Sequence, residues 1–138
     1  MMPTETVCLA VNGTLMRGLA LNANFLALGA TFAAETVTAP IYRLWSIEEG
    51  YPAMQRVSQG GAAIALELWQ LPVASLATLL EQEPPGLCVG KVHLANGEAV
   101  LGIVAEAITC EGQLDITPWG GWRAYIDAPA LSPPAPSR

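Results

Sequence analysis

Short apolar runs separated by turn-forming residues are the feature that most restricts the fold of this chain. Asn96-Gly97 stands between the runs 87–94 and 99–107, and this dipeptide favours the tight turn of a β-hairpin. Further strand candidates of similar length are 6–11, 31–38, 41–47, 62–71 and the β-like stretch 114–126. Short strands that are mostly linked by hairpins are typical of an α+β or barrel-like domain.

Two short helices are predicted between these strands. Leu21, Phe25 and Leu28 recur at helical spacing, which predicts a helix over 22–28 that ends at Gly29. A second helix is expected to begin at Pro72 and to end before Pro84-Pro85-Gly86. The stretch 48–61 contains Gly50 and Pro52 near its start and Gly60-Gly61 at its end, so we interpret it as a loop.

The composition limits both the architecture and the class of partner. The 138 residues suffice for one domain, for which we expect a flexible end at 1–5, a folded part at 6–127 and a Pro-rich disordered tail at 128–138. Charged residues make up 13% and hydrophobic residues 52%, which excludes a largely disordered chain. Six basic against twelve acidic residues argue against a nucleic-acid partner.

No apolar run approaches the roughly 20 residues that a membrane-spanning helix needs. The N-terminus has no basic segment followed by a long apolar one, so no signal peptide is expected. The three cysteines are isolated from one another in the sequence. These features predict reduced thiols and a cytoplasmic location.

The first candidate site is the loop that follows the first predicted strand, Asn12-Gly13-Thr14-Leu15-Met16-Arg17. Its glycine lets successive N–H groups turn toward one point, and such a nest holds an anion, commonly a carboxylate. Arg17 can add a positive charge. The alternative is an ordinary turn between a strand and a helix.

The second candidate is Glu83, which follows Leu76, Leu79 and Leu80 by seven, four and three residues. This spacing places Glu83 on the apolar face of the predicted helix, whereas Glu81 points away. Burial would raise the pKa of Glu83, as a general acid or base at neutral pH requires. The alternative is a glutamate at the helix end that leans into solvent.

Glu67 lies in the middle of a predicted strand, on the face opposite Leu66 and Leu68. We expect that face to be solvated, unless the sheet closes and turns it inward. The sequence has a single histidine and contains no GxSxG, GxGxxG, P-loop or metal-ligand pattern, which excludes a Ser-His-Asp triad. Any chemistry must therefore use carboxylates, backbone N–H groups, arginine or tyrosine.

Several segments resemble the C-terminal domain of allophanate hydrolase, which belongs to the γ-glutamylcyclotransferase-like superfamily. The loop VNGTLMRG is similar to that superfamily's YGSLRRG-type loop, and LLEQEP is similar to its LDxxEG pattern, with Glu83 at the catalytic glutamate. The segments that resemble the hydrolase domain are TAPIYRLW (38–45), GGAAIALELWQLP (60–72), GLCVGKVHLANGEAVLG (86–102) and DITPWGGWRAYI (115–126). The chain differs at Asn12, where cyclotransferases have tyrosine, and at Thr14, where hydrolase domains often have histidine.

The resemblance implies an α+β fold with a small mixed β-barrel and flanking short helices. It also implies that the N–H groups of Gly13, Thr14 and Leu15 bind a substrate carboxylate, and that Glu83 shuttles protons. Known cyclotransferases close an α-amine onto a γ-amide to give 5-oxoproline. The hydrolase domain aids the breakdown of the carboxylated product that an amidase domain forms.

Two functions follow from the resemblance. The first is an enzyme for a small carboxylate with an amide or ureido group, held by residues 12–15 and Arg17, with Glu83 as general acid or base. Candidates for orienting the substrate are Tyr42, Arg43, Arg123 and Tyr125. The second is a free-standing, non-catalytic module that binds a separate amidase subunit in urea- or allophanate-type nitrogen catabolism. A homodimer is also expected, and neither function needs a cofactor or a metal.

Overall fold

The computed structural model describes residues 5–128, which form an α+β fold. The strands are β1 (Thr6–Val11), β2 (Thr31–Val37), β3 (Tyr42–Ile47), β4 (Tyr51–Arg56), β5 (Ala65–Pro72), β6 (Leu87–His93), β7 (Ala99–Ala105) and β8 (Leu114–Asp115). The helices are α1 (Asn22–Ala27), α2 (Leu76–Gln82), α3 (Ala107–Cys110) and α4 (Trp122–Asp127), and 3₁₀ turns lie at Val73–Ser75 and Thr117–Trp119. The predicted flexible and disordered ends, 1–5 and 128–138, fall outside the described residues except for Glu5 and Ala128.

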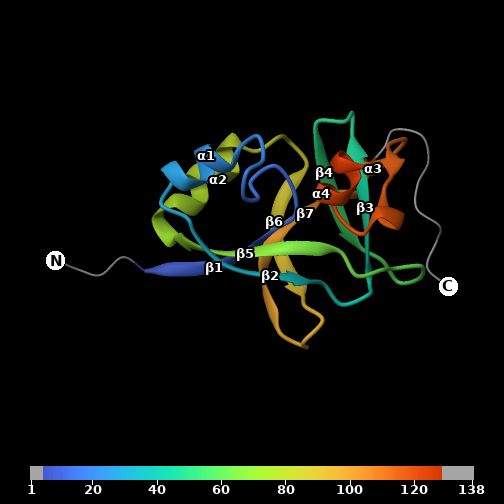
Figure 1. The fold of residues 1–138 in the computed structure, drawn as a ribbon, viewed down its shortest axis with the longest axis horizontal. Coiled ribbons are helices and arrows are strands. Elements are labelled where there is room, and N and C mark those ends of the chain that lie inside the picture. Colours follow the sequence, from blue (N-terminus) through green and yellow to red (C-terminus); the bar gives the residue numbers. More distant parts are fainter. Residues whose placement is uncertain (1–4, 129–138) are drawn as a thin grey trace.

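Most strands belong to one five-stranded sheet in the order β2-β5-β1-β7-β6. β5 runs antiparallel to both of its neighbours, whereas β1 and β7 are parallel. β6 and β7 form the hairpin that Asn96-Gly97 predicts. A second sheet has the order β4-β3-β8. Figure 1 shows α1 and α2 together at one end of the molecule and α3 and α4 beside the second sheet.

The expected closed barrel is not observed, because the strands form two separate sheets. The two edges of the large sheet meet at a single bridge between Thr38 and Leu94, next to a hydrogen bond from Ala39 N–H to His93 O of 2.9 Å. Pro40 follows at once and has no N–H group with which to extend the ladder. The chain therefore leaves the sheet there and continues into β3.

The prediction of a loop over 48–61 is wrong for residues 51–56, which form β4 and pair antiparallel with β3. Glu48 and Glu49 make the turn between the two strands, with φ angles of 51° and 62°. Pro52 is tolerated because β4 is an edge strand, where a missing N–H breaks no ladder. A strand that contains proline next to a glycine turn is easily mistaken for a loop.

The prediction of a β-like stretch over 114–126 is wrong after Asp115, where β8 ends. Gly120 has a φ of 79° and ends the 3₁₀ turn, and α4 begins at Trp122. Trp122 and Tyr125 then lie on one side of α4, with ring centroids 5.7 Å apart. Aromatic residues are typical of strands, but Trp122 and Tyr125 are three residues apart and therefore lie on the same side of a helix.

The main hydrophobic core joins the large sheet to α1 and α2 and extends to β3, β4 and α4. Trp69 of β5 is buried and packs on Phe25 of α1, with 5.1 Å between ring centroids. Leu79 contributes the buried side chain of α2. The two predicted helices are confirmed, although the second starts with a 3₁₀ turn rather than directly at Pro72. None of the helices within residues 5–128 is long and apolar enough to span a bilayer.

The parallel pairing of β1 and β7 leads to a prediction about Gly102. A Cβ atom there would lie 2.5 Å from Val92 Cγ2 and 3.1 Å from Ala10 Cβ, and both neighbours are buried in the core. We expect Gly102→Ala to lower the free energy of unfolding by about 1–3 kcal/mol, the usual cost of overpacking. Chemical denaturation measures this change.

Gly50→Ala is the control, because its Cβ would meet nothing closer than 3.5 Å. Equal stability of Gly102→Ala and the wild-type protein would contradict the packing of β1 against β7.

Candidate functional site

A cavity of about 260 Å³ opens where the chain leaves β1, and we call it the loop cavity. It is lined by residues 11–15, 20–21, 50–52 and 83–84, with Leu87 and Ile103. The walls are mostly apolar, and the carboxyl of Glu83 and the phenol of Tyr51 lie among them. A cavity of this volume suits a small molecule.

Residues 12–15 of the loop after β1 line this cavity. Asn12 is buried and its Nδ2 donates to Ile103 O at 3.0 Å, while Met16 N–H closes a turn on Gly13 O at 3.0 Å. Within residues 5–128, the N–H groups of Gly13, Thr14 and Leu15 donate to no protein acceptor. Three consecutive N–H groups without an acceptor, on residues beside a cavity, can donate hydrogen bonds to the carboxylate of a ligand.

Gly13 is required by the close approach of β4. A Cβ atom at this position would lie 2.5 Å from Pro52 Cδ and 2.6 Å from Pro52 Cγ. Because proline is rigid, a larger residue at position 13 would displace the loop or the strand. The contact thus fixes one end of the loop against the floor of the cavity.

Glu83 lies at the C-terminal end of α2, where it is half-buried and lines the loop cavity. Its side chain has no hydrogen-bond or ion-pair partner among the described residues. Burial raises the pKa of Glu83 above its usual value. Glu83 therefore lines the same cavity as Gly13, Thr14 and Leu15.

Sequence reasoning missed Tyr51, which lines the loop cavity from the first position of β4. Burial raises the pKa of Tyr51, and the negative charges of Glu48 and Glu83 raise it further. Tyr51 and Glu83 thus line the same cavity. The prediction of a loop over 48–61 concealed this residue.

Glu67, expected on a solvated face, is instead buried, with only 2% of its surface exposed. Its Oε1 accepts from Arg17 N–H at 2.9 Å and from Trp69 Nε1 at 3.1 Å. Its Oε2 accepts from Arg17 Nε at 3.2 Å and from Arg123 Nη2 at 3.1 Å. We call Glu67, Arg17, Arg123 and Trp69 the Glu67 cluster, in which paired charges and four donors make burial of a carboxylate tolerable.

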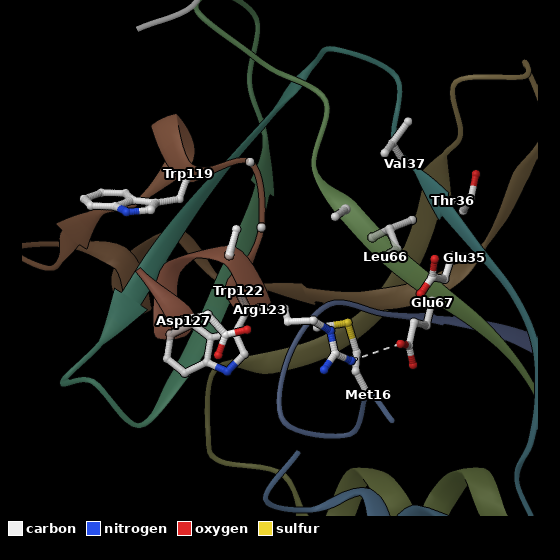
Figure 2. Close-up of a pocket in the computed structure, with 14 residues that line it drawn as sticks. Met16, Glu35, Thr36, Val37, Leu66, Glu67, Trp119, Trp122, Arg123 and Asp127 are labelled. Atoms are coloured by element: carbon white, nitrogen blue, oxygen red, sulfur yellow. Dashed lines mark hydrogen bonds and ion pairs between the residues drawn. The ribbon is translucent and has the colours of Figure 1, made fainter. Parts of the chain in front are cut away.

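A larger cavity of about 640 Å³ lies on the other side of the Glu67 cluster. Figure 2 shows Arg123 and Met16 between Trp122 of α4 on one side and Glu67 of β5 on the other. The arginines at positions 17 and 123, which the sequence offers as substrate ligands, thus bind Glu67 and do not line the loop cavity. Their charges are used to compensate a buried carboxylate.

The other three candidates from the sequence line neither cavity. Tyr42 is fully buried and its hydroxyl accepts from His93 N–H at 2.9 Å. Arg43 Nε donates to Asp115 Oδ2 at 2.7 Å. Tyr125 donates to the Glu49 carboxylate at 2.6 Å. Their polar groups are therefore occupied by contacts within the fold.

No group of three histidine, cysteine or acidic side chains that could hold a metal ion occurs within residues 5–128. The polar groups on residues that line the loop cavity include the Glu83 carboxyl, the Tyr51 phenol, the Thr14 hydroxyl and the N–H groups of residues 13–15. This set can bind an anion and move a proton.

The fold and this cavity define a class of small α+β domain in which a turn after the first strand faces an acidic helix end. A model of the allophanate hydrolase C-terminal domain matches residues 7–127, and the chain belongs to this family. The resemblance noted in the sequence is thereby confirmed.

Two curated relatives are urea amidolyases. That of Saccharomyces cerevisiae is 30% identical over 132 residues, which are 91% of this chain and 7% of the yeast protein. That of Lachancea kluyveri is 31% identical over the same shares of both proteins. The chain thus spans less than a tenth of the length of these relatives.

Solved structures share the fold. A uropathogenic E. coli-specific protein is 52% identical, with a TM-score of 0.87, and the match covers 88% of this chain and 96% of that one. Kluyveromyces lactis allophanate hydrolase is 31% identical, with a TM-score of 0.83. The match covers 88% of this chain and 21% of the hydrolase chain. An AIG2-like protein of Mus musculus is 20% identical and shares the fold with a TM-score of 0.58. The match covers 76% of this chain and 79% of the mouse protein.

The burial of Glu83 predicts a pH-dependent contribution to stability. Because its folded-state pKa lies above the ordinary value of 4.5, ionisation of Glu83 destabilises the folded chain. The stability of the wild-type protein relative to Glu83→Gln is therefore highest below that value and is lost as the pH rises through the folded-state pKa. Chemical denaturation of both proteins from about pH 4 to about pH 8 tests this.

Glu81→Gln serves as the control, because Glu81 is exposed on the same helix and the same exchange of carboxyl for amide there leaves the loop cavity untouched. A wild-type protein that gains stability relative to Glu83→Gln as the pH rises would show that the fold stabilises the Glu83 carboxylate, and a difference that is constant with pH would show that Glu83 is solvated.

Proposed function

We propose that the chain is an enzyme domain that acts on a small carboxylate bearing an amide or ureido group. The observation that carries the proposal is one cavity of about 260 Å³ lined both by Glu83 and by three loop residues with unpaired N–H groups. The N–H groups of Gly13, Thr14 and Leu15 bind the substrate carboxylate. Glu83 faces the amide or ureido nitrogen.

The raised pKa suits Glu83 to proton transfer near neutral pH. As a carboxylate, Glu83 takes a proton from the amine or water as that nucleophile bonds to the carbonyl carbon and the C=O pair moves to the oxygen. As an acid, it returns that proton to the substrate nitrogen while the C=O pair returns, the C–N bond breaks and its bonding pair passes to the nitrogen. The glutamate ends in its starting state, and Tyr51 donates a hydrogen bond that orients the substrate.

The family supports a nitrogen-containing substrate. Relatives include urea amidolyases and an allophanate hydrolase, although this chain spans only 7% and 21% of the lengths of such proteins. We therefore propose a role in nitrogen metabolism, with either a carboxylated amide or a γ-glutamyl compound as substrate. The expected amidase partner, the homodimer and the cytoplasmic location stay predictions.

The test is Glu83→Gln, which keeps the shape of the side chain and removes its proton transfer. We expect kcat to fall by about a hundred- to ten-thousandfold, with a small change in KM, because substrate binding rests on the loop. The assays use γ-glutamyl dipeptides, and allophanate that a separate amidase deaminates in the same reaction.

Glu81→Gln is the matched control on α2 and should retain the activity of the wild-type protein. Full activity of Glu83→Gln would remove Glu83 from the reaction. A wild-type protein that turns over neither class of substrate would overturn the proposal of an enzyme.

A further inference from the structure

Both backbone groups of Arg17 are held by side chains from distant parts of the chain. Arg17 N–H donates to Glu67 Oε1 at 2.9 Å, and Arg123 Nη2 donates to Arg17 O at 2.9 Å. Glu67 belongs to β5 and Arg123 to α4. Arg17, two residues after Leu15 in the loop that follows β1, is therefore fixed from two elements at once.

The groups that hold Arg17 are themselves immobilised. Arg123 binds Glu67 Oε2 with the same Nη2 atom that reaches Arg17 O, and Trp69 Nε1 holds Oε1. The Arg17 guanidinium also pairs with Glu35 and lies 3.8 Å from the ring centroid of Phe32. Because the partners of Arg17 are themselves held and its guanidinium has contacts of its own, Arg17 has little freedom to shift.

The loop lies between the two cavities. Gly13, Thr14 and Leu15 line the loop cavity, whereas Met16 lines the larger cavity together with Glu67 and Arg123. Figure 2 shows Arg123 joined to Glu67 beside Met16, on this second side. Glu67 and Arg123 are therefore not among the residues that a ligand in the loop cavity would meet.

We propose that Glu67 and Arg123 are positioning residues that hold the anion-binding loop in place through Arg17. The proposal rests on the proposed function of the loop cavity, because it accounts for how the N–H groups of Gly13, Thr14 and Leu15 are held in place. An anion nest binds well only if its N–H groups are fixed in advance, because ordering a mobile loop upon binding costs affinity. The Glu67 cluster holds the loop in its binding conformation before the ligand binds.

The test compares Arg123→Met with Arg43→Met. Both arginines bind one carboxylate and one backbone carbonyl, Arg43 through Asp115 and Gly60 O. Their exposed side-chain fractions are similar, 42% and 32%. Arg43 touches neither cavity, so it matches Arg123 in chemistry but not in position. Thermal unfolding verifies that both variants fold.

The measurements are the Kd for succinamate, a small molecule with one carboxylate and one amide, and amide hydrogen exchange at Met16 and Arg17, whose N–H groups are hydrogen-bonded to Gly13 O and Glu67 Oε1. We expect Arg123→Met to weaken succinamate binding by about tenfold and to speed exchange in the loop. Arg43→Met should change neither. Glu67→Gln, which keeps the side-chain volume, should act in the same direction as Arg123→Met.

Wild-type affinity and wild-type loop exchange in both Arg123→Met and Glu67→Gln would overturn the positioning role and leave the proposed function intact. If the wild-type protein does not bind succinamate, the proposed function loses its support. Loop exchange then still decides whether Glu67 and Arg123 hold the loop.

Discussion

The Glu67 carboxylate lies in the interior of the protein, and much of the surrounding arrangement follows from the need to satisfy it. An unpaired buried charge would cost several kcal/mol, so the fold must bring donors to both oxygens. Arg17 comes from the loop after β1, Arg123 from α4 and Trp69 from β5 itself. One side chain thus ties the start, the middle and the end of the described chain together.

The same arrangement separates polar groups that are paired within the fold from polar groups that are not. The donors and acceptors of the Glu67 cluster are paired with one another, which stabilises the loop from the side of the larger cavity. On the opposite side, the N–H groups of Gly13 to Leu15 have no acceptor within residues 5–128, and Glu83 has no side-chain partner there. Polar groups that the fold does not satisfy are available to a ligand.

Local patterns in the sequence predict the features that depend on neighbouring residues. Asn96-Gly97 predicts the β6–β7 hairpin, and helical spacing predicts that Glu83 faces inward. Glu67 could not be placed in this way, because its partners Arg17 and Arg123 lie 50 and 56 residues away. Without those partners in view, a glutamate in a strand indicates a solvated face.

The remaining errors have a similar cause. Pro52 is compatible with a strand only because β4 lies at the edge of its sheet, and the sequence does not reveal the sheet order. Tyr51 was missed for the same reason. The Trp119-Gly120-Gly121-Trp122 segment has the aromatic residues of a strand, but Gly120 adopts a left-handed conformation and α4 follows.

The central claim is that a ligand carboxylate binds the loop N–H groups opposite Glu83. A crystal structure of the wild-type protein with succinamate tests it most directly. The claim predicts that the carboxylate lies within hydrogen-bond distance of the N–H groups of Gly13, Thr14 and Leu15, with the amide nitrogen toward Glu83. Succinamate bound only in the larger cavity beside Arg123, or an empty loop cavity at saturating succinamate, would contradict it.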